Sequence, residues 1–256
     1  MRPGALRDGL RLSFGTLTLL PVRAPTVVDR DAAAVAMTAA LLPGALLGLA
    51  VGATTALLLA LGLAPLPVGF VAVGVGVLLT RFLHLDGLAD TADGLTAGHT
   101  PERALEVMHR GDVGPAGATV LVLVLAGQAT AVAAVAGAGH PWWAVVGLLT
   151  LAWAGSRAVL ALLTAVGTRP AQRSGLGAGV LGSVPRSVCW APAALLGALG
   201  LLGAGWPAAL AVVAGLVAAA GLAVHAHRRL GGLTGDVLGA GVEVALLAAL
   251  AVLTAL

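Results

Sequence analysis

Long apolar stretches alternate with short polar ones along the 256 residues of the chain. A helix that crosses a bilayer needs about 20 apolar residues, and most of these stretches reach that length. The fifth stretch is short and begins with an interruption by proline, so the pattern is compatible with six spans or with seven. The candidate spans are residues 33–60, 65–83, 116–137, 142–167, 189–204, 207–227 and 237–256. The pattern predicts an all-α, polytopic transmembrane bundle that forms a single domain over residues 1–256.

The composition supports a membrane protein. Hydrophobic residues make up 59% of the chain, charged residues 10%, and the mean hydropathy is +1.02. Soluble domains carry about 25% charged residues, and a soluble fold of this length has too little interior for so much Leu, Ala and Val. The net charge of +3 is too small to indicate a nucleic-acid partner. The partner that the composition predicts is the lipid bilayer.

The charged residues fall into alternate connections between the spans. The connections 61–64, 138–141 and 205–206 contain no Arg, Asp or Glu. Thirteen of the 14 arginines lie in or beside the other four polar segments, which are residues 1–32, 84–115, 168–188 and 228–236. Because Arg accumulates in cytoplasmic loops, this distribution places the N-terminus and the polar segments inside and the C-terminus outside.

The most informative polar segment is residues 84–94, with the sequence HLDGLADTADG. Asp86, Asp90 and Asp93 have helical spacing and would share an arc of about 60° on one face. Three carboxylates so close repel one another unless a cation neutralises them. Oxygen ligands without cysteine suit Mg²⁺ or Mn²⁺, and Mg²⁺ typically combines few carboxylates with substrate phosphates. The spacing therefore indicates metal-assisted phosphoryl transfer, the alternative being a solvated acidic cap.

Two neighbouring features are less specific. His84 would lie on the opposite helix face from the aspartates, as a ligand or as an interfacial or supporting residue. Thr100 and Pro101 predict the start of an amphipathic cytoplasmic helix, in which Glu106 and Arg110 are spaced for an ion pair.

The last two polar segments contain glycine-rich sequences. Residues 173–179 (RSGLGAG) would offer backbone N–H groups to a phosphate or form a flexible loop. Residues 228–244 begin RRLGGLTGD, and Arg228, Arg229, Thr234 and Asp236 form a candidate phosphate and metal clamp. Ionisable residues inside spans are functional candidates. The chain has two of them, Arg157 and Glu243, which would alternatively pair with each other.

Together these segments resemble the cobalamin synthase family, the adenosylcobinamide-GDP ribazoletransferases. The resemblance rests on HLDGLADTADG, LEVM (105–108), GLGAG (175–179) and RRLGGLTGDVLGA (228–240), and extends from residue 17 to Glu243. It implies a multi-pass enzyme of the bacterial cytoplasmic (inner) membrane that needs Mg²⁺. The implied reaction joins α-ribazole, or its 5′-phosphate, to adenosylcobinamide-GDP and releases GMP.

The motifs and the resemblance lead to one hypothesis for the site at the cytoplasmic face. The candidate metal ligands are Asp86, Asp90, Asp93 and Asp236. The candidate catalytic residues are Asp93, Asp90 and His84, with Asp93 preferred as acceptor of the hydroxyl proton. The candidate substrate-binding residues are Arg81, Arg110, Arg157, Arg228, Arg229 and Thr234.

The chain departs from the family pattern at two places. His109-Arg110-Gly111-Asp112 stands where the family usually has Lys/Arg-Asp-Ser-Arg, and Arg81-Phe82 stands where it usually has Gly-Gly. Two other functions fit parts of the pattern. A CDP-alcohol-type phosphotransferase also uses aspartate-rich membrane helices, but Asp90 stands where that pattern needs Arg. A small-solute transporter would explain Arg157 and Glu243, but its polar groups would lie near the midplane.

Overall fold

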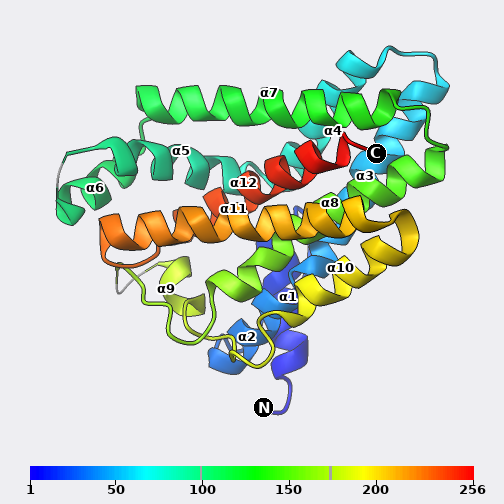
Figure 1. Ribbon diagram of the computed structural model, residues 1–256. Coiled ribbons are helices and arrows are strands. Elements are labelled where there is room, and N and C mark those ends of the chain that lie inside the picture. Colours follow the sequence, from blue (N-terminus) through cyan, green and yellow to red (C-terminus); the bar gives the residue numbers. More distant parts are fainter. Residues whose placement is uncertain (99, 173–174) are drawn as a thin grey trace.

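The computed structural model describes residues 1–98, 100–172 and 175–256, and this part of the chain is built from helices (Figure 1). Long runs of Leu, Ala and Val favour helices because a backbone in lipid must satisfy its own hydrogen bonds. The helices are α1 (Ala5–Leu17), α2 (Arg30–Thr38), α3 (Leu41–Ala60), α4 (Pro65–Leu79), α5 (Leu83–Thr96), α6 (Pro101–Met108), α7 (Pro115–Gly137), α8 (Trp142–Leu163), α9 (Leu176–Val180), α10 (Ala191–Ala204), α11 (Trp206–Leu230) and α12 (Gly235–Leu253).

The expected polytopic helical bundle is confirmed, but it has five or six candidate spans in the described residues where six or seven were expected. In the described residues, five helical segments are long and apolar enough to cross a membrane. They are α2 with α3 (Arg30–Ala60), α7, α8, α11 and α12. A sixth span results if α4 and α5, which are bent by 94°, are taken as one. The expected fifth span is only the 14-residue helix α10, which covers about 21 Å at 1.5 Å per residue.

The two ends of the bundle differ in polarity. In Figure 1 the connections α3–α4, α7–α8 and α10–α11 lie at the right, together with the C-terminus. Helix α6, the C-terminal end of α5 and the α11–α12 connection lie at the opposite end. Two of the four charged segments therefore lie at the end of the bundle opposite the uncharged turns, whereas the N-terminal segment with α1 and α2 lies at the bottom centre of the view.

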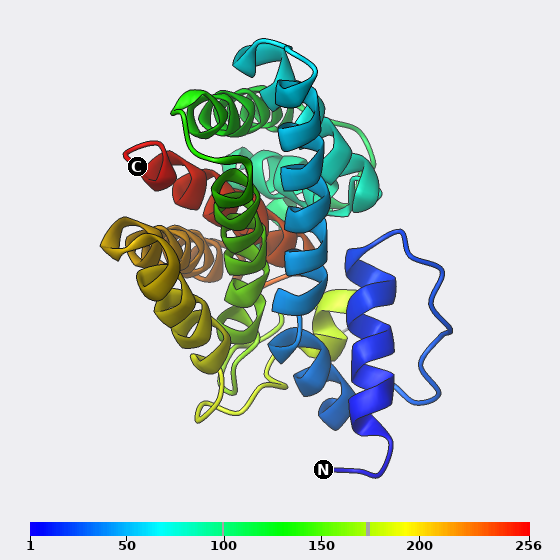
Figure 2. The same cartoon turned by 90° about the vertical axis from the view of Figure 1, so that its right-hand side faces the viewer.

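The polar N-terminal segment 1–32, expected as a connection, contains the amphipathic helix α1. Figure 2 shows α1 beside α2 and α3 at the edge of the bundle. Arg2 fixes it there, because its guanidinium lies 2.8 Å from the Asp8 carboxylate in α1 and 2.5 Å from that of Asp29, which caps α2. The Arg2 guanidinium lowers the pKa of Asp8 to about 2, so this ion pair persists at physiological pH.

The expected second span, residues 65–83, ends four residues early. Helix α4 stops at Leu79, and the backbone turns through Arg81 (φ 55°) and Phe82 (φ 61°) before α5 begins. Each of these residues adopts the left-handed conformation that glycine tolerates and other residues avoid. This turn ends α4 and lets α5 leave in a new direction, so the aspartates stand on a helix separate from the apolar one.

We expect Phe82→Gly to stabilise the protein by up to ~1 kcal/mol. A left-handed non-glycine residue costs about 1–2 kcal/mol, and the greater chain entropy of glycine offsets part of this gain. Phe82 is 54% exposed, so little packing is lost. Thermal unfolding of the purified protein in detergent measures the effect. The control is Val71→Gly in the middle of α4, where Val71 is 47% exposed and glycine should destabilise the helix by about 1 kcal/mol. A lower melting temperature for Phe82→Gly would contradict the expectation.

Candidate active site

Helices α5 and α12 cross at backbone contact. A Cβ atom added to Gly87 of α5 would lie 2.7 Å from the carbonyl oxygen and 2.9 Å from the Cα atom of Asp236. One turn further along α12, a Cβ atom on Gly239 would lie 3.3 Å from the Cα atom of His84. Glycine at both positions lets the helices approach this closely. The crossing brings Asp86 and Asp236, which are far apart in the sequence, to the same place.

The first turn of α12 is held by Thr234. Its Oγ1 atom accepts a hydrogen bond from the Val237 amide (3.2 Å) and donates one to Oδ2 of Asp236 (3.2 Å). Thr234 is therefore the N-cap of α12. Asp236 follows two residues later, where a negative charge is favoured by the positive end of the helix dipole.

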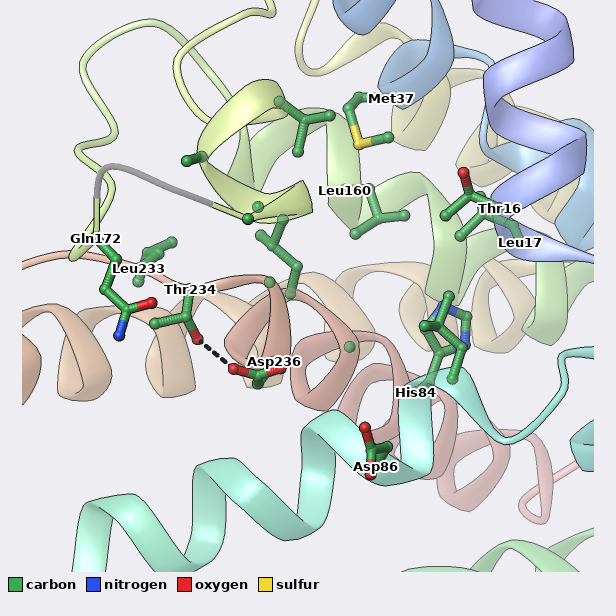
Figure 3. A pocket seen from close by; sticks show the side chains of 18 of the residues that line it. Thr16, Leu17, Met37, His84, Asp86, Leu160, Gln172, Leu233, Thr234 and Asp236 are labelled. Carbon is green, nitrogen blue, oxygen red and sulfur yellow. Dashed lines mark hydrogen bonds between the residues drawn. The ribbon is translucent and has the colours of Figure 1, made fainter. Parts of the chain in front are cut away.

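Asp86 and Asp236 line a cavity of about 370 Å³ (Figure 3). Its walls come from α1, α2, α5, α8, α9 and the start of α12. Figure 3 shows both carboxylates in the lower part of the view, whereas Thr16, Leu17, Met37 and Leu160 gather above them. The cavity thus has an acidic end at the α5–α12 crossing and an apolar end between α1, α2 and α8.

The three aspartates of α5 have different surroundings. Asp86 is exposed and lines the cavity, whereas Asp90 is half-buried one turn further along. Both oxygens of the buried Asp93 accept backbone hydrogen bonds, from Gly114 N (2.7 Å) and Gly117 N (2.9 Å) at the start of α7. Asp93 therefore fastens α5 to the first turn of α7, and the shared helix face does not give the three carboxylates one common environment.

His84, Arg157 and Glu243 meet in the interior of the bundle. Nδ1 of His84 lies 3.7 Å from Oε1 of Glu243 and 3.5 Å from Nη2 of Arg157. Gln128 donates a 2.8 Å hydrogen bond to Oε2 of Glu243, and Arg157 donates one of 2.7 Å to Ser156. The two ionisable span residues, expected to pair directly or to act in function, are thus joined through His84. His84 also lines the cavity and connects this cluster to it.

Three of the other four candidate arginines make structural contacts in the described part of the chain. Arg81 donates to the Gly15 carbonyl (2.7 Å), and Arg110 pairs with Glu106 at 3.1 Å, as its spacing predicts. Arg229 donates to the carbonyls of Ala97 (3.1 Å) and Gly98, and Arg228 is exposed. Of the six candidate substrate-binding residues, Thr234 is the one that the structure places in the wall of the cavity.

The cavity also contains residues that the motifs did not indicate. His109, Gln172 and Thr16 line it, and they come from three separate segments. The sequence feature that could have pointed to His109 is the departure from the family pattern at residues 109–112. Gly175 and Gly177 of the expected glycine-rich segment also line the cavity, whereas Arg173 and Ser174 of that segment lie outside the described residues.

The acidic end offers oxygen ligands without a fully formed metal site. In the described residues, Asp86, Asp90 and Asp236 take part in no ion pair, and no group of three or more His, Cys, Asp or Glu side chains is arranged to hold a metal. Two uncompensated carboxylates beside a cavity suit Mg²⁺, which keeps waters and takes further oxygens from substrate phosphates. The donor set therefore fits a magnesium ion that arrives with a phosphorylated ligand.

Comparisons with known proteins agree with these motifs. A family model described as cobalamin-5-phosphate synthase matches residues 9–254. The chain is 44% identical to an adenosylcobinamide-GDP ribazoletransferase of Nocardioides over 96% of its own length and 97% of the relative. It is 36% identical to a protein of that name from Corynebacterium efficiens, over 93% of this chain and 88% of the relative. No solved structure matches the chain. The chain belongs to the cobalamin-5-phosphate synthase family and is a transferase of cobalamin synthesis.

Proposed function

We propose that this protein transfers the adenosylcobinamide-phosphate group of adenosylcobinamide-GDP to α-ribazole or its 5′-phosphate, releasing GMP. The observation that carries this proposal is the convergence of Asp86 and Asp236 on one cavity, in a family whose curated relatives bear the name of this reaction. Phosphoryl transfer depends on positioning and on stabilisation of charge. A rigid helix crossing that holds two carboxylates beside a cavity supplies the positioning.

In the proposed reaction, a ribazole hydroxyl attacks the phosphorus next to the cobinamide arm, and the bond from this phosphorus to the GMP oxygen breaks. Asp86 and Asp236 would hold Mg²⁺, which when bound supplies positive charge that offsets the charge of the diphosphate and of the leaving GMP. Thr234 holds the carboxylate of Asp236 in place through its hydrogen bond.

Asp90 is the proposed acceptor of the hydroxyl proton. It stands one helical turn from Asp86, and in the described residues its carboxylate accepts no hydrogen bond. Asp93, the acceptor favoured by the sequence, engages both oxygens with backbone N–H groups of α7. A carboxylate whose two oxygens already accept backbone hydrogen bonds is not free to turn toward a substrate hydroxyl.

We place the protein in the bacterial cytoplasmic (inner) membrane with the N-terminus and the cavity toward the cytoplasm. The polar segments that carry thirteen of the 14 arginines support this orientation under the positive-inside rule. The cavity lies beside these segments, since α1, α9 and the start of α12 form its walls. Its phosphorylated substrate would therefore enter from the aqueous side that contains nucleotides.

The direct test is purified protein in detergent with adenosylcobinamide-GDP, α-ribazole and Mg²⁺. We expect GMP to be released in a 1:1 ratio with the cobalamin product, and excess EDTA to abolish its release until Mg²⁺ is restored. Parallel reactions with a CDP-alcohol and an alcohol acceptor should release no CMP. Full activity in EDTA would contradict the proposed metal, and absence of GMP release in Mg²⁺ would contradict the proposed reaction.

A further inference from the structure

The apolar end of the cavity has a chemistry of its own. Leu17 of α1, Met37 of α2 and Leu160 of α8 line it, whereas the carboxylates lie at the other end (Figure 3). Leu17, Met37 and Leu160 are each less than one-tenth exposed. A diphosphate gains nothing from such a surface, because burying a charge without partners is costly. The apolar end therefore suits an apolar group that is attached to a polar one.

We propose that this cavity binds the acceptor nucleoside, with its methylated benzimidazole base at the apolar end and its ribose hydroxyl near Asp86 and Asp236. This assignment rests on the proposed function. The reaction has two substrates, and the cavity of about 370 Å³ is near the lower end of the ~300–1,000 Å³ range of small-molecule sites. It accommodates a nucleoside, whereas a corrin ring with its amide side chains is far larger.

The guanine of the donor is a poorer match for the apolar end. Guanine carries an amino group, a carbonyl and a ring N–H on its edge, and each would need a partner when buried. The polar side chains near that end in the described residues are Thr16 and His84 (Figure 3). Dimethylbenzimidazole presents two methyl groups and an aromatic face, which gain free energy on leaving water. The chemistry of the lining therefore selects the acceptor base over the donor base.

Helix α1 completes this end of the cavity. Leu12, Thr16 and Leu17 belong to α1 and line the cavity, and Arg2 fixes the helix to Asp29, the N-cap of α2. The apolar end is thus formed by side chains of α1, α2 and α8 held in a fixed relation. Such a rigid wall can discriminate between bases by size.

The test is to fill the apolar end from two sides, with Leu160→Phe and Met37→Phe. We expect each variant to raise the KM for α-ribazole by ~10-fold or more, since one methylene in a tight pocket changes specificity by about 10–200-fold. The KM for adenosylcobinamide-GDP should stay unchanged. In these variants the KM for the α-riboside of unmethylated benzimidazole, which is smaller, should rise less than the KM for α-ribazole. The matched control is Leu199→Phe on the exposed face of α10, where Leu199 is 54% exposed. Its KM values for both substrates should equal those of the wild type.

A binding measurement separates this assignment from the proposed reaction. Calorimetry with α-ribazole alone should detect binding to the wild-type protein and at least ~10-fold weaker binding to folded Leu160→Phe or Met37→Phe. Size-exclusion profiles and melting temperatures establish which variants are folded. A rise in the KM for adenosylcobinamide-GDP alone, or no change in either KM in both folded variants, would overturn the assignment while leaving the reaction intact. Failure of the wild type to release GMP would instead overturn the reaction.

Discussion

Asp236→Asn is expected to lower the rate of GMP release by ~10³-fold or more, and Asp86→Asn should do the same. Both carboxylates line the acidic end of the cavity, where they would hold the proposed Mg²⁺. An amide keeps the shape of the side chain but removes the negative charge. Loss of several kcal/mol of charge stabilisation corresponds to this change in rate. The measurement is kcat for GMP release at saturating Mg²⁺ and substrates.

The stability of these variants should remain close to that of the wild type. In the described residues neither carboxylate belongs to an ion pair, and Asn can still accept the hydrogen bond from Thr234. Glu102→Gln is the matched control, because Glu102 is an exposed carboxylate on α6 in the same polar segment. It should keep wild-type turnover. Near-normal turnover in both aspartate variants would remove these carboxylates from the active site.

Gly87→Ala should lower activity by ~10²-fold or more. The added methyl group would meet the backbone of Asp236 at 2.7–2.9 Å, closer than non-bonded atoms allow. Because backbone atoms cannot rotate away, α5 and α12 must move apart, and a displacement of about 1 Å at a reacting centre costs ~10²-fold. We also expect a loss of about 1–3 kcal/mol in stability from overpacking. Turnover and thermal unfolding in detergent measure the two effects.

The control for this substitution is Gly74→Ala in the neighbouring helix α4. A Cβ atom on Gly74 meets no atom within 4 Å, so alanine should be neutral or slightly stabilising through its higher helix propensity. Wild-type activity and stability in Gly87→Ala would show that the crossing is looser than the structure indicates. It would also weaken the inference that this crossing positions Asp86 and Asp236.

The class of fold and much of the local structure follow from the amino-acid sequence alone. The apolar stretches predicted α7, α8, α11 and α12 to within a few residues, because lipid demands long apolar helices whatever their neighbours are. Local chemistry predicted Thr100 as the cap of α6 and the ion pair between Glu106 and Arg110. These features depend on residues only a few positions apart. The family was also recognisable from the sequence, since its motifs are short and continuous.

The surroundings of each polar side chain, in contrast, depend on how distant helices pack. Helical spacing correctly put Asp86, Asp90 and Asp93 on one face, but the start of α7 covers Asp93 whereas Asp86 borders a cavity. Likewise, the sequence left open whether Arg157 and Glu243 pair directly or act in function, and the packing of α5 places His84 between them. Periodicity describes the direction of a side chain from its own helix axis. It contains no information about which distant helix crosses at that point, and that crossing determines the shape and the chemistry of the site.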